Sequence, residues 1–132
     1  MVNDPIADLL VRIKNSGLAH KTEVRVPYSR VKEAILNVIS GAGFVGEFQI
    51  SGNNGKKELI VKLKYDANSD HVVREIRRIS TPGCRIYIAS SEIRKRMRGK
   101  NRLGIISTSR GVISNRQALQ QNLGGELLAI IW

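Results

Sequence analysis

Short apolar segments, each with the period of either a helix or a strand, constrain the fold of this 132-residue chain more than any other feature. Behind Asp4, which can cap a helix, apolar side chains recur at the i, i+3, i+4 and i+7 spacing of one helix face. Ser29 can cap a second helix. Alternating segments predict three strands, at residues 23–27, 44–50 and 58–65. The order helix, strand, helix, strand, strand indicates a small α+β unit.

A polar segment at residues 66–70 follows this unit, and we place a domain boundary after residue 66 because the balance of charge changes there. Residues 72–79 have features of both a helix and a strand, and we favour a strand. Further elements are predicted as strands at residues 85–88, 103–107 and 126–132, and as helices that begin at Ser90 or Ser91 and at Ser114. We therefore predict an α+β fold of two small α/β domains packed together, with short helices against small sheets. The N-terminal domain is residues 1–66 and the C-terminal domain is residues 67–132.

Positive charge dominates the chain. Lys and Arg number 22 against 11 Asp and Glu, which leaves a formal net charge of +11 and a pI near 10.4. The excess is uneven, because residues 1–66 carry +3 and residues 67–132 carry +8. A polyanion would offset such self-repulsion. Charge alone does not separate RNA, DNA and anionic lipid, and a merely soluble surface is the alternative.

Motifs of common enzyme classes are missing from the sequence. There is no glycine-rich phosphate loop, and His20 and His71 have no partners at metal-ligand spacing. Cys84 is the single cysteine, and we interpret it as a small packed hydrophobe. No apolar run is long enough to span a membrane, and no secretory signal is evident. We therefore expect a soluble intracellular protein without catalytic residues, metal, cofactor or small-molecule substrate.

The densest positive stretch is residues 94–102, which hold six cations and no acid. In a nucleic-acid-binding protein such side chains contact phosphates, which gives affinity and salt dependence without sequence information. The alternative is a solvated helix face and loop. The lack of a compensating acid favours phosphate contacts. The residues that we predict to bind RNA here are Lys95, Arg98, Lys100 and Arg102.

A second candidate is the hydroxyl-rich segment at the end of an apolar strand, Ser107, Thr108, Ser109, Arg110 and Gly111. Its short hydroxyl side chains suit close approach to a backbone or a ribose, and the glycine removes a side chain that would block that approach. RNA offers matching 2′-hydroxyls and base edges. An ordinary hydroxyl-rich turn explains the same residues, and the sequence alone does not decide between the two.

The third candidate is Tyr87 with its neighbour Arg85. An exposed tyrosine on a strand can stack on a base while the arginine pairs with phosphate. A core tyrosine is the alternative. Glu126, an acid in a basic half of the chain, can orient a neighbouring arginine or accept a hydrogen bond from a base amino group.

Several of these segments together resemble one family. They are residues 4–8 (DPIAD) and 12–15 (RIKN), 82–87 (PGCRIY), 107–113 (STSRGVI), 124–126 (GGE) and the terminal Trp132. Their order and spacing are similar to those of small-subunit ribosomal protein eight of the bacterial and organellar type, over nearly the whole chain.

The resemblance implies a non-enzymatic ribonucleoprotein of translation that binds rRNA, specifically the central domain of small-subunit ribosomal RNA, and supports ribosome assembly. Its partners would be that RNA, neighbouring small-subunit proteins and its own messenger, in a cytoplasmic or an organellar ribosome. Carried over by position, the main RNA-reading surface would be Ser107, Thr108, Ser109 and Gly111 with Tyr87 and Glu126. Arg12 and Asn15 on the first helix would add a second contact.

Two rival classes remain open from the residues themselves. A basic module for anionic membranes or an acidic protein partner would need a long helix with cations on one side and aromatic residues on the other, and neither of the first two helices has this pattern. DNA binding is a nearer rival, yet no recognition-helix pattern is present.

Overall fold

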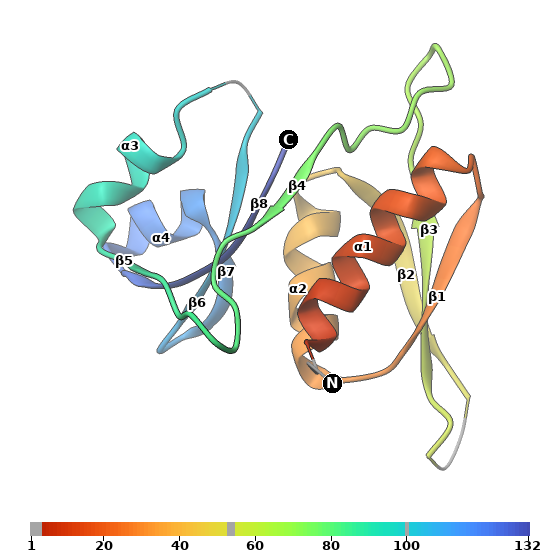
Figure 1. Cartoon of the computed structure of the whole chain (residues 1–132), viewed down its shortest axis with the longest axis horizontal. Helices are drawn as coiled ribbons and strands as arrows, with labels where there is room; N and C mark the ends of the chain where they lie inside the picture. Colours follow the sequence, from red (N-terminus) through yellow and green to blue (C-terminus); the bar gives the residue numbers. More distant parts are fainter. Residues whose placement is uncertain (1–3, 53–54, 100) are drawn as a thin grey trace. The chain divides into compact units, whose positions relative to one another are not determined.

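The computed structural model describes residues 4–52, 55–99 and 101–132, and it divides the chain into two compact units, Met1–Arg74 and Glu75–Trp132 (Figure 1). Each unit has its own antiparallel sheet and its own helices. The prediction of an α+β fold with two small domains is confirmed.

The first unit places two helices on a three-stranded sheet of order β1-β3-β2. Its elements are α1 (Pro5–Leu18), β1 (Glu23–Pro27), α2 (Arg30–Gly41), β2 (Val45–Ser51) and β3 (Glu58–Leu63). Side-chain caps begin both helices as predicted, because Asp4 accepts from the N–H of Ala7 and Ser29 accepts from the N–H of Lys32, each at 3.2 Å. The apolar stripes of α1 and α2 are buried against β1 and β2, with Ile13 and Ile39 almost fully enclosed.

The connection after β3 folds back on the first unit. Tyr65 bridges His71, and the N–H of Val72 donates to the carbonyl of Lys64 at 3.1 Å. Arg74 pairs with Asp66 at 3.1 Å. These contacts tie residues 71–74 to residues 64–66, which directly follow β3, and the structure divides the chain after Arg74, later than the polar segment where the sequence suggested a boundary.

The second unit is built on the sheet order β4-β8-β6-β7, and the short β5 also pairs with β8. Its elements are β4 (Ile76–Arg78), β5 (Tyr87–Ile88), the 3₁₀ helix η1 (Ser90–Glu92), α3 (Ile93–Arg96), β6 (Leu103–Thr108), β7 (Gly111–Ser114), α4 (Asn115–Gln121) and β8 (Gly125–Ile131). The strand favoured within residues 72–79 is present as β4. A reciprocal capping box between Ser114 and Gln117 begins α4, as its sequence predicted.

Two expectations for the second unit differ from the structure. The segment after the hydroxyl-rich run forms β7, which pairs with β6 as a hairpin, where the sequence suggested only a turn that leads into a helix. Cys84 is exposed rather than packed, because it lies in a tight turn closed by reciprocal backbone hydrogen bonds with Thr81. A turn at the surface leaves the thiol accessible to solvent.

His71 in the first unit is buried without a hydrogen-bond partner at Nε2 in the part of the chain that the structure describes. Its ring lies in the space that a Cβ on Gly17 would fill, and it contacts Tyr65, which stacks on His20. Burial, with a smaller contribution from the charge of His20, lowers the pKa of His71.

This environment predicts that acid destabilises the first unit. Because the unfolded chain binds the proton more readily, the contribution of His71 is fully present above about pH 6.5 and is lost as the pH falls from there through its lowered pKa. Urea unfolding between about pH 7 and pH 5 measures the loss. The variant His71→Leu should lack this pH dependence, whereas His20→Gln, at the only other histidine, should retain it. An equal slope with pH in His71→Leu and the parent would contradict the assignment.

Candidate nucleic-acid interface

One row of side chains crosses the second sheet from β5 to β7. Tyr87 lies opposite Glu126, Glu126 lies opposite Ser107, and Ser107 lies opposite Val112. Directly opposed residues of antiparallel strands point to the same face of a sheet. These residues, Tyr87, Glu126, Ser107 and Val112, therefore share one face, and we call them the cross-strand row.

The other face of the same strands is the core of the second unit. Each member of the row has a buried sequence neighbour, whose side chain points to the opposite face. These neighbours are Ile88 after Tyr87, Leu127 after Glu126, Ile106 before Ser107 and Ile113 after Val112. They form one apolar cluster with Ile93 of α3 and Ala118 of α4. Helices therefore close one face, and the row lies on the other, where Tyr87 is 71% exposed. Of the two interpretations of Tyr87, the structure supports the exposed ring over the core tyrosine.

The hydroxyl-rich segment forms the tip of the β6–β7 hairpin, next to Ser107 of the row. The Thr108 hydroxyl accepts from the N–H of Arg110 at 3.1 Å and donates to the carbonyl of Gly111 at 2.9 Å. Gly111 has a φ of +101°, a conformation that residues with a side chain rarely adopt. Thr108 and Gly111 thus hold the turn together, which leaves Ser109 and Arg110 exposed at the tip.

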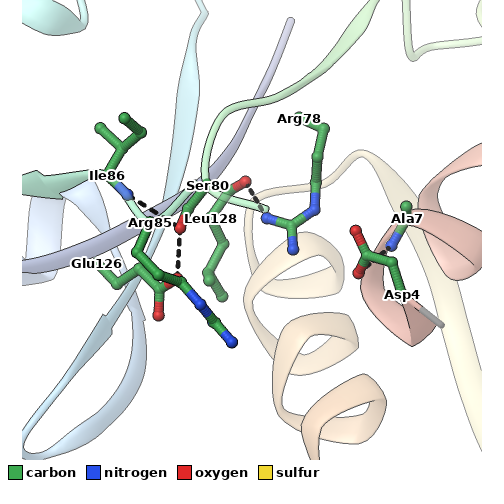
Figure 2. A network of polar contacts seen from close by, with 8 residues as sticks. All are labelled: Asp4, Ala7, Arg78, Ser80, Arg85, Ile86, Glu126 and Leu128. Atoms are coloured by element: carbon green, nitrogen blue, oxygen red, sulfur yellow. Dashed lines mark hydrogen bonds and ion pairs between the residues drawn. The ribbon is translucent and has the colours of Figure 1, made fainter. Parts of the chain in front are cut away.

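Glu126 of the row is held in place by two donors (Figure 2). The hydroxyl of Ser80, which is fully buried, donates to its carboxylate, and the Arg85 guanidinium pairs with the same oxygen at 3.0 Å. The Ser80 oxygen also accepts from the backbone N–H of Ile86 at 3.1 Å. Burial by itself would raise the pKa of Glu126, but these hydrogen bonds and the charges of Arg85 and Arg78 hold its pKa below its usual value.

The ionised carboxylate therefore serves to orient Arg85. Its guanidinium remains about half exposed and is held on Glu126, the residue that lies opposite the exposed Tyr87 in the sheet. An oriented cation and an exposed aromatic ring that are both tied to one strand position suit a nucleic-acid strand, since one group pairs with phosphate while the other stacks on a base. Of the two roles considered for Glu126, the contacts support the one in which it orients a neighbouring arginine.

The second unit has few acids to balance its cations. Residues 75–132 contain only three, and each accepts a hydrogen bond within the unit. Glu75 accepts from the N–H of Ile76 at 3.0 Å, Glu92 accepts from the N–H of Ala89 at 3.2 Å, and Glu126 is held as described. The surface of this unit is therefore strongly positive.

The basic stretch at residues 94–102 begins on the short helix α3. Arg94, Lys95, Arg96 and Arg98 are exposed, and within the described residues none of them pairs with a carboxylate. Lys100, which the sequence also predicted to bind RNA, lies outside the described residues. These exposed cations can meet phosphates without first breaking an internal contact.

Arg102 differs from the rest of that stretch because its side chain is half-buried. The guanidinium carbon lies 4.5 Å from the centroid of the Trp132 ring. The guanidinium of Arg77 on β4 also lies over this ring, at 5.2 Å. The sequence predicted Arg102 as a contact of the basic stretch, but the structure groups it with a tryptophan and an arginine that were not predicted.

Arg12 and Asn15 lie on the exposed face of α1 in the first unit. Arg12 Nε pairs with Asp8 at 3.1 Å, and its Nη1 donates to the carbonyl of Arg25 at 3.2 Å. These bonds fix the guanidinium between α1 and β1. Both predicted residues are therefore accessible, and they belong to a different unit from the cross-strand row.

Ser80 is the site residue that sequence reasoning missed. It carries no local signal, since its carboxylate partner lies 46 positions away in the chain. Backbone hydrogen bonds that continue the pairing of β4 with β8 bring Ser80 and Glu126 together, since the N–H of Ser80 donates to the carbonyl of Leu127 at 3.1 Å. The pairing of β5 with β8 places Tyr87 opposite Glu126, a relation that the sequence could not give.

Neither a metal centre nor a membrane span is found in the described part of the chain. No three His, Cys, Asp or Glu side chains among residues 4–52, 55–99 and 101–132 are grouped to hold a metal ion. Over these same ranges, no helix has the length and the apolar content that crossing a bilayer requires. The side chains of the cross-strand row, the hairpin tip and α3 can stack, form hydrogen bonds and carry positive charge.

Comparison with known proteins gives matches along the whole chain. Residues 4–132 match the family model described as Ribosomal protein S8. The small ribosomal subunit protein uS8 of Mycoplasma mobile is 41% identical over 132 residues, which cover 100% of this chain and 98% of the relative. The uS8 protein of Geotalea daltonii is 40% identical over 133 aligned residues, with 99% and 98% coverage. That of Lactobacillus johnsonii is 36% identical over 132 residues, with 100% and 99% coverage.

The resemblance drawn from the residues is confirmed by these matches. The family consists of structural proteins of the ribosome, in agreement with the prediction that the chain is not an enzyme. Because the family model covers residues 4–132 and two of these relatives are 40% and 41% identical over nearly their whole length, the chain belongs to the ribosomal protein S8 family.

Proposed function

We propose that the protein is a constituent of the small ribosomal subunit whose second unit binds and holds a structured segment of small-subunit ribosomal RNA. The observation that carries this proposal is the cross-strand row, in which the exposed Tyr87 lies opposite Glu126, the carboxylate that orients Arg85, and Glu126 lies opposite Ser107, which adjoins the hairpin tip. The family relation and the names of the relatives support the same partner.

Different side chains of this surface recognise different parts of the RNA. The Tyr87 ring stacks on an unpaired base, and the Ser109 hydroxyl reaches a ribose or a base edge. Arg85, Arg110 and the exposed cations of α3 meet phosphates, which supplies affinity that does not depend on sequence. Arg12 and Asn15 add a contact from the first unit. None of these groups transfers a proton or forms a bond, so the function is recognition.

The resemblance narrows the target to a helical region with an irregular internal loop in the central domain of that RNA. An irregular loop offers the unstacked bases that an exposed tyrosine and short hydroxyls can reach. The protein would bind early in the cytoplasm and fix the shape of this RNA for neighbouring small-subunit proteins. A segment of its own messenger with the same shape would compete for the same surface and so repress translation.

The experiment is a binding titration of the purified protein against fragments of small-subunit ribosomal RNA over a series of salt concentrations. A DNA duplex of equal length is the competitor, and the leader of the protein's own messenger is a further arm. Binding to one central-domain fragment that survives excess DNA is the expected result. Weak, salt-labile binding to every fragment and to DNA would contradict the proposal and leave only a generic polyanion binder.

Removal of the α3 cations should weaken binding to all RNAs alike. We expect the combined change Arg94→Gln, Lys95→Gln and Arg96→Gln to lower affinity for specific and unrelated RNA by the same factor. The slope of log affinity against log salt should become shallower by about 0.7 for each single-strand phosphate contact that is lost. A matched control with Arg25→Gln, Arg30→Gln and Lys62→Gln removes the same charge from exposed positions of the first unit. Equal effects of the two variants would show that only net charge matters.

A further inference from the structure

Two arginines lie over one indole ring at the end of the second sheet that is remote from the cross-strand row. Arg77 belongs to β4, Arg102 precedes β6, and Trp132 follows β8, so three neighbouring strands meet here. The guanidinium carbons lie 5.2 and 4.5 Å from the ring centroid. We call these three residues, Arg77, Arg102 and Trp132, the tryptophan clamp.

The ring of the clamp is fixed by its surroundings. The backbone of Trp132 exchanges two hydrogen bonds with Glu75, at 2.9 and 3.1 Å, which continue the pairing of β8 with β4. The side chain is half-buried and packs against the apolar core of the second unit. The guanidinium groups therefore rest on a rigid support, in contrast to the exposed cations of α3.

Neither guanidinium of the clamp is neutralised by the described residues. Arg77 and Arg102 have no ion pair there, and the Glu75 carboxylate of the neighbouring position accepts from the N–H of Ile76. An arginine that lies over an aromatic ring keeps its charge and its N–H donors, which match the oxygens of a phosphate in pairs. Two such groups on one support, one from β4 and one directly before β6, on either side of β8, are preorganised to meet phosphate oxygens.

We propose that the tryptophan clamp is a second anion site, which binds phosphates of the RNA backbone apart from the cross-strand row. This inference rests on the proposed function, because it assigns a further contact with the same RNA. The residues of β8 between Glu126 and Trp132 extend about 20 Å at the rise of a strand. The two sites therefore hold different nucleotides of one folded RNA.

Trp132 is the only tryptophan of the chain, so its fluorescence reports on the clamp directly. The central-domain fragment carries a label, and one titration records both the anisotropy of the RNA and the emission of Trp132. We expect the emission to change in step with binding in the parent. The double variant Arg77→Gln with Arg102→Gln should lose this change, bind about tenfold more weakly and show a shallower salt slope.

Two further variants distinguish an effect of the clamp itself from an effect of lost net charge. Trp132→Leu keeps apolar contact but removes the ring, so we expect weaker binding with most of the salt slope retained. Arg25→Gln with Arg30→Gln removes equal charge from the first unit and should leave both the emission change and most of the affinity. Parent affinity and an unchanged emission response in the Arg77 and Arg102 double variant would overturn the clamp while leaving the proposed function intact.

A separate arm does not depend on the ribosomal target. Inorganic polyphosphate titrated into the parent should alter Trp132 emission, and the Arg77 and Arg102 double variant should not respond. Failure of the parent to select a central-domain fragment would contradict the proposed function alone. If neither polyphosphate nor RNA changed the emission of Trp132, the result would contradict the clamp alone.

Discussion

The variant Gly125→Ala should lose about 3 kcal/mol in the free energy of unfolding of the second unit. A Cβ at this position would lie 2.2 Å from the carbonyl oxygen of Ser107 and 3.0 Å from its carbonyl carbon. Both atoms belong to the backbone of β6, so no side chain can rotate away. The strands β6 and β8 would have to separate at the point where Ser107 pairs with Glu126. RNA binding should therefore fall together with stability.

Urea unfolding followed by Trp132 fluorescence measures this loss in the second unit, which contains the only tryptophan. Gly83→Ala is the matched control, because a Cβ at Gly83 would meet no atom within 4 Å. We expect that control to stay within about 0.5 kcal/mol of the parent. Equal unfolding midpoints for the two variants would show that β6 and β8 tolerate a side chain between them.

Tyr87→Ala should weaken binding to the specific RNA by roughly 1–3 kcal/mol, or about five- to a hundredfold, because it removes the surface on which a base stacks. Tyr87 is 71% exposed and lies outside the apolar core, so the free energy of unfolding should change little. Affinity for unrelated RNA should be nearly unchanged, in contrast to loss of the α3 cations. A fluorescence anisotropy titration with specific and unrelated RNA measures both effects.

Tyr87→Phe is the control for this prediction, since it keeps the ring and removes the hydroxyl. We expect it to bind nearly as well as the parent if stacking carries the contact. Ser109→Ala should also weaken the specific complex while preserving the fold, because its hydroxyl lies exposed at the hairpin tip. Parent affinity in both Tyr87→Ala and Ser109→Ala would remove the cross-strand row and the tip from the proposed interface.

Local patterns predicted most of the secondary structure because caps and periodicity depend on residues only a few positions apart. Asp4, Ser29 and Ser114 each begin a helix by accepting a hydrogen bond from an N–H three positions later. The strand β7 was not predicted, because its local pattern is too short. It has only four residues, and its segment follows a hydroxyl-rich turn that is equally typical of a loop.

The candidate site was predicted only in part, because its residues come from several strands. Tyr87, Arg85, Glu126 and the hydroxyl segment were each identified from residue type or family resemblance. Their mutual placement depends on the register of β5, β8 and β6. Thr108 closes the turn whereas Ser109 stays exposed, and this difference depends on the hydrogen bonds of the folded hairpin.

The sequence by itself determined the α+β class, the starts of α1, α2 and α4, the excess of positive charge and the family. Each of these follows from composition, from neighbours within one helical turn, or from segments in a fixed order. Only the tertiary structure decided that Ser80 and Arg85 hold Glu126, that Cys84 is exposed, and that Arg77 and Arg102 share the Trp132 ring. These contacts join residues up to 55 positions apart and depend on strand register, which a local pattern does not encode.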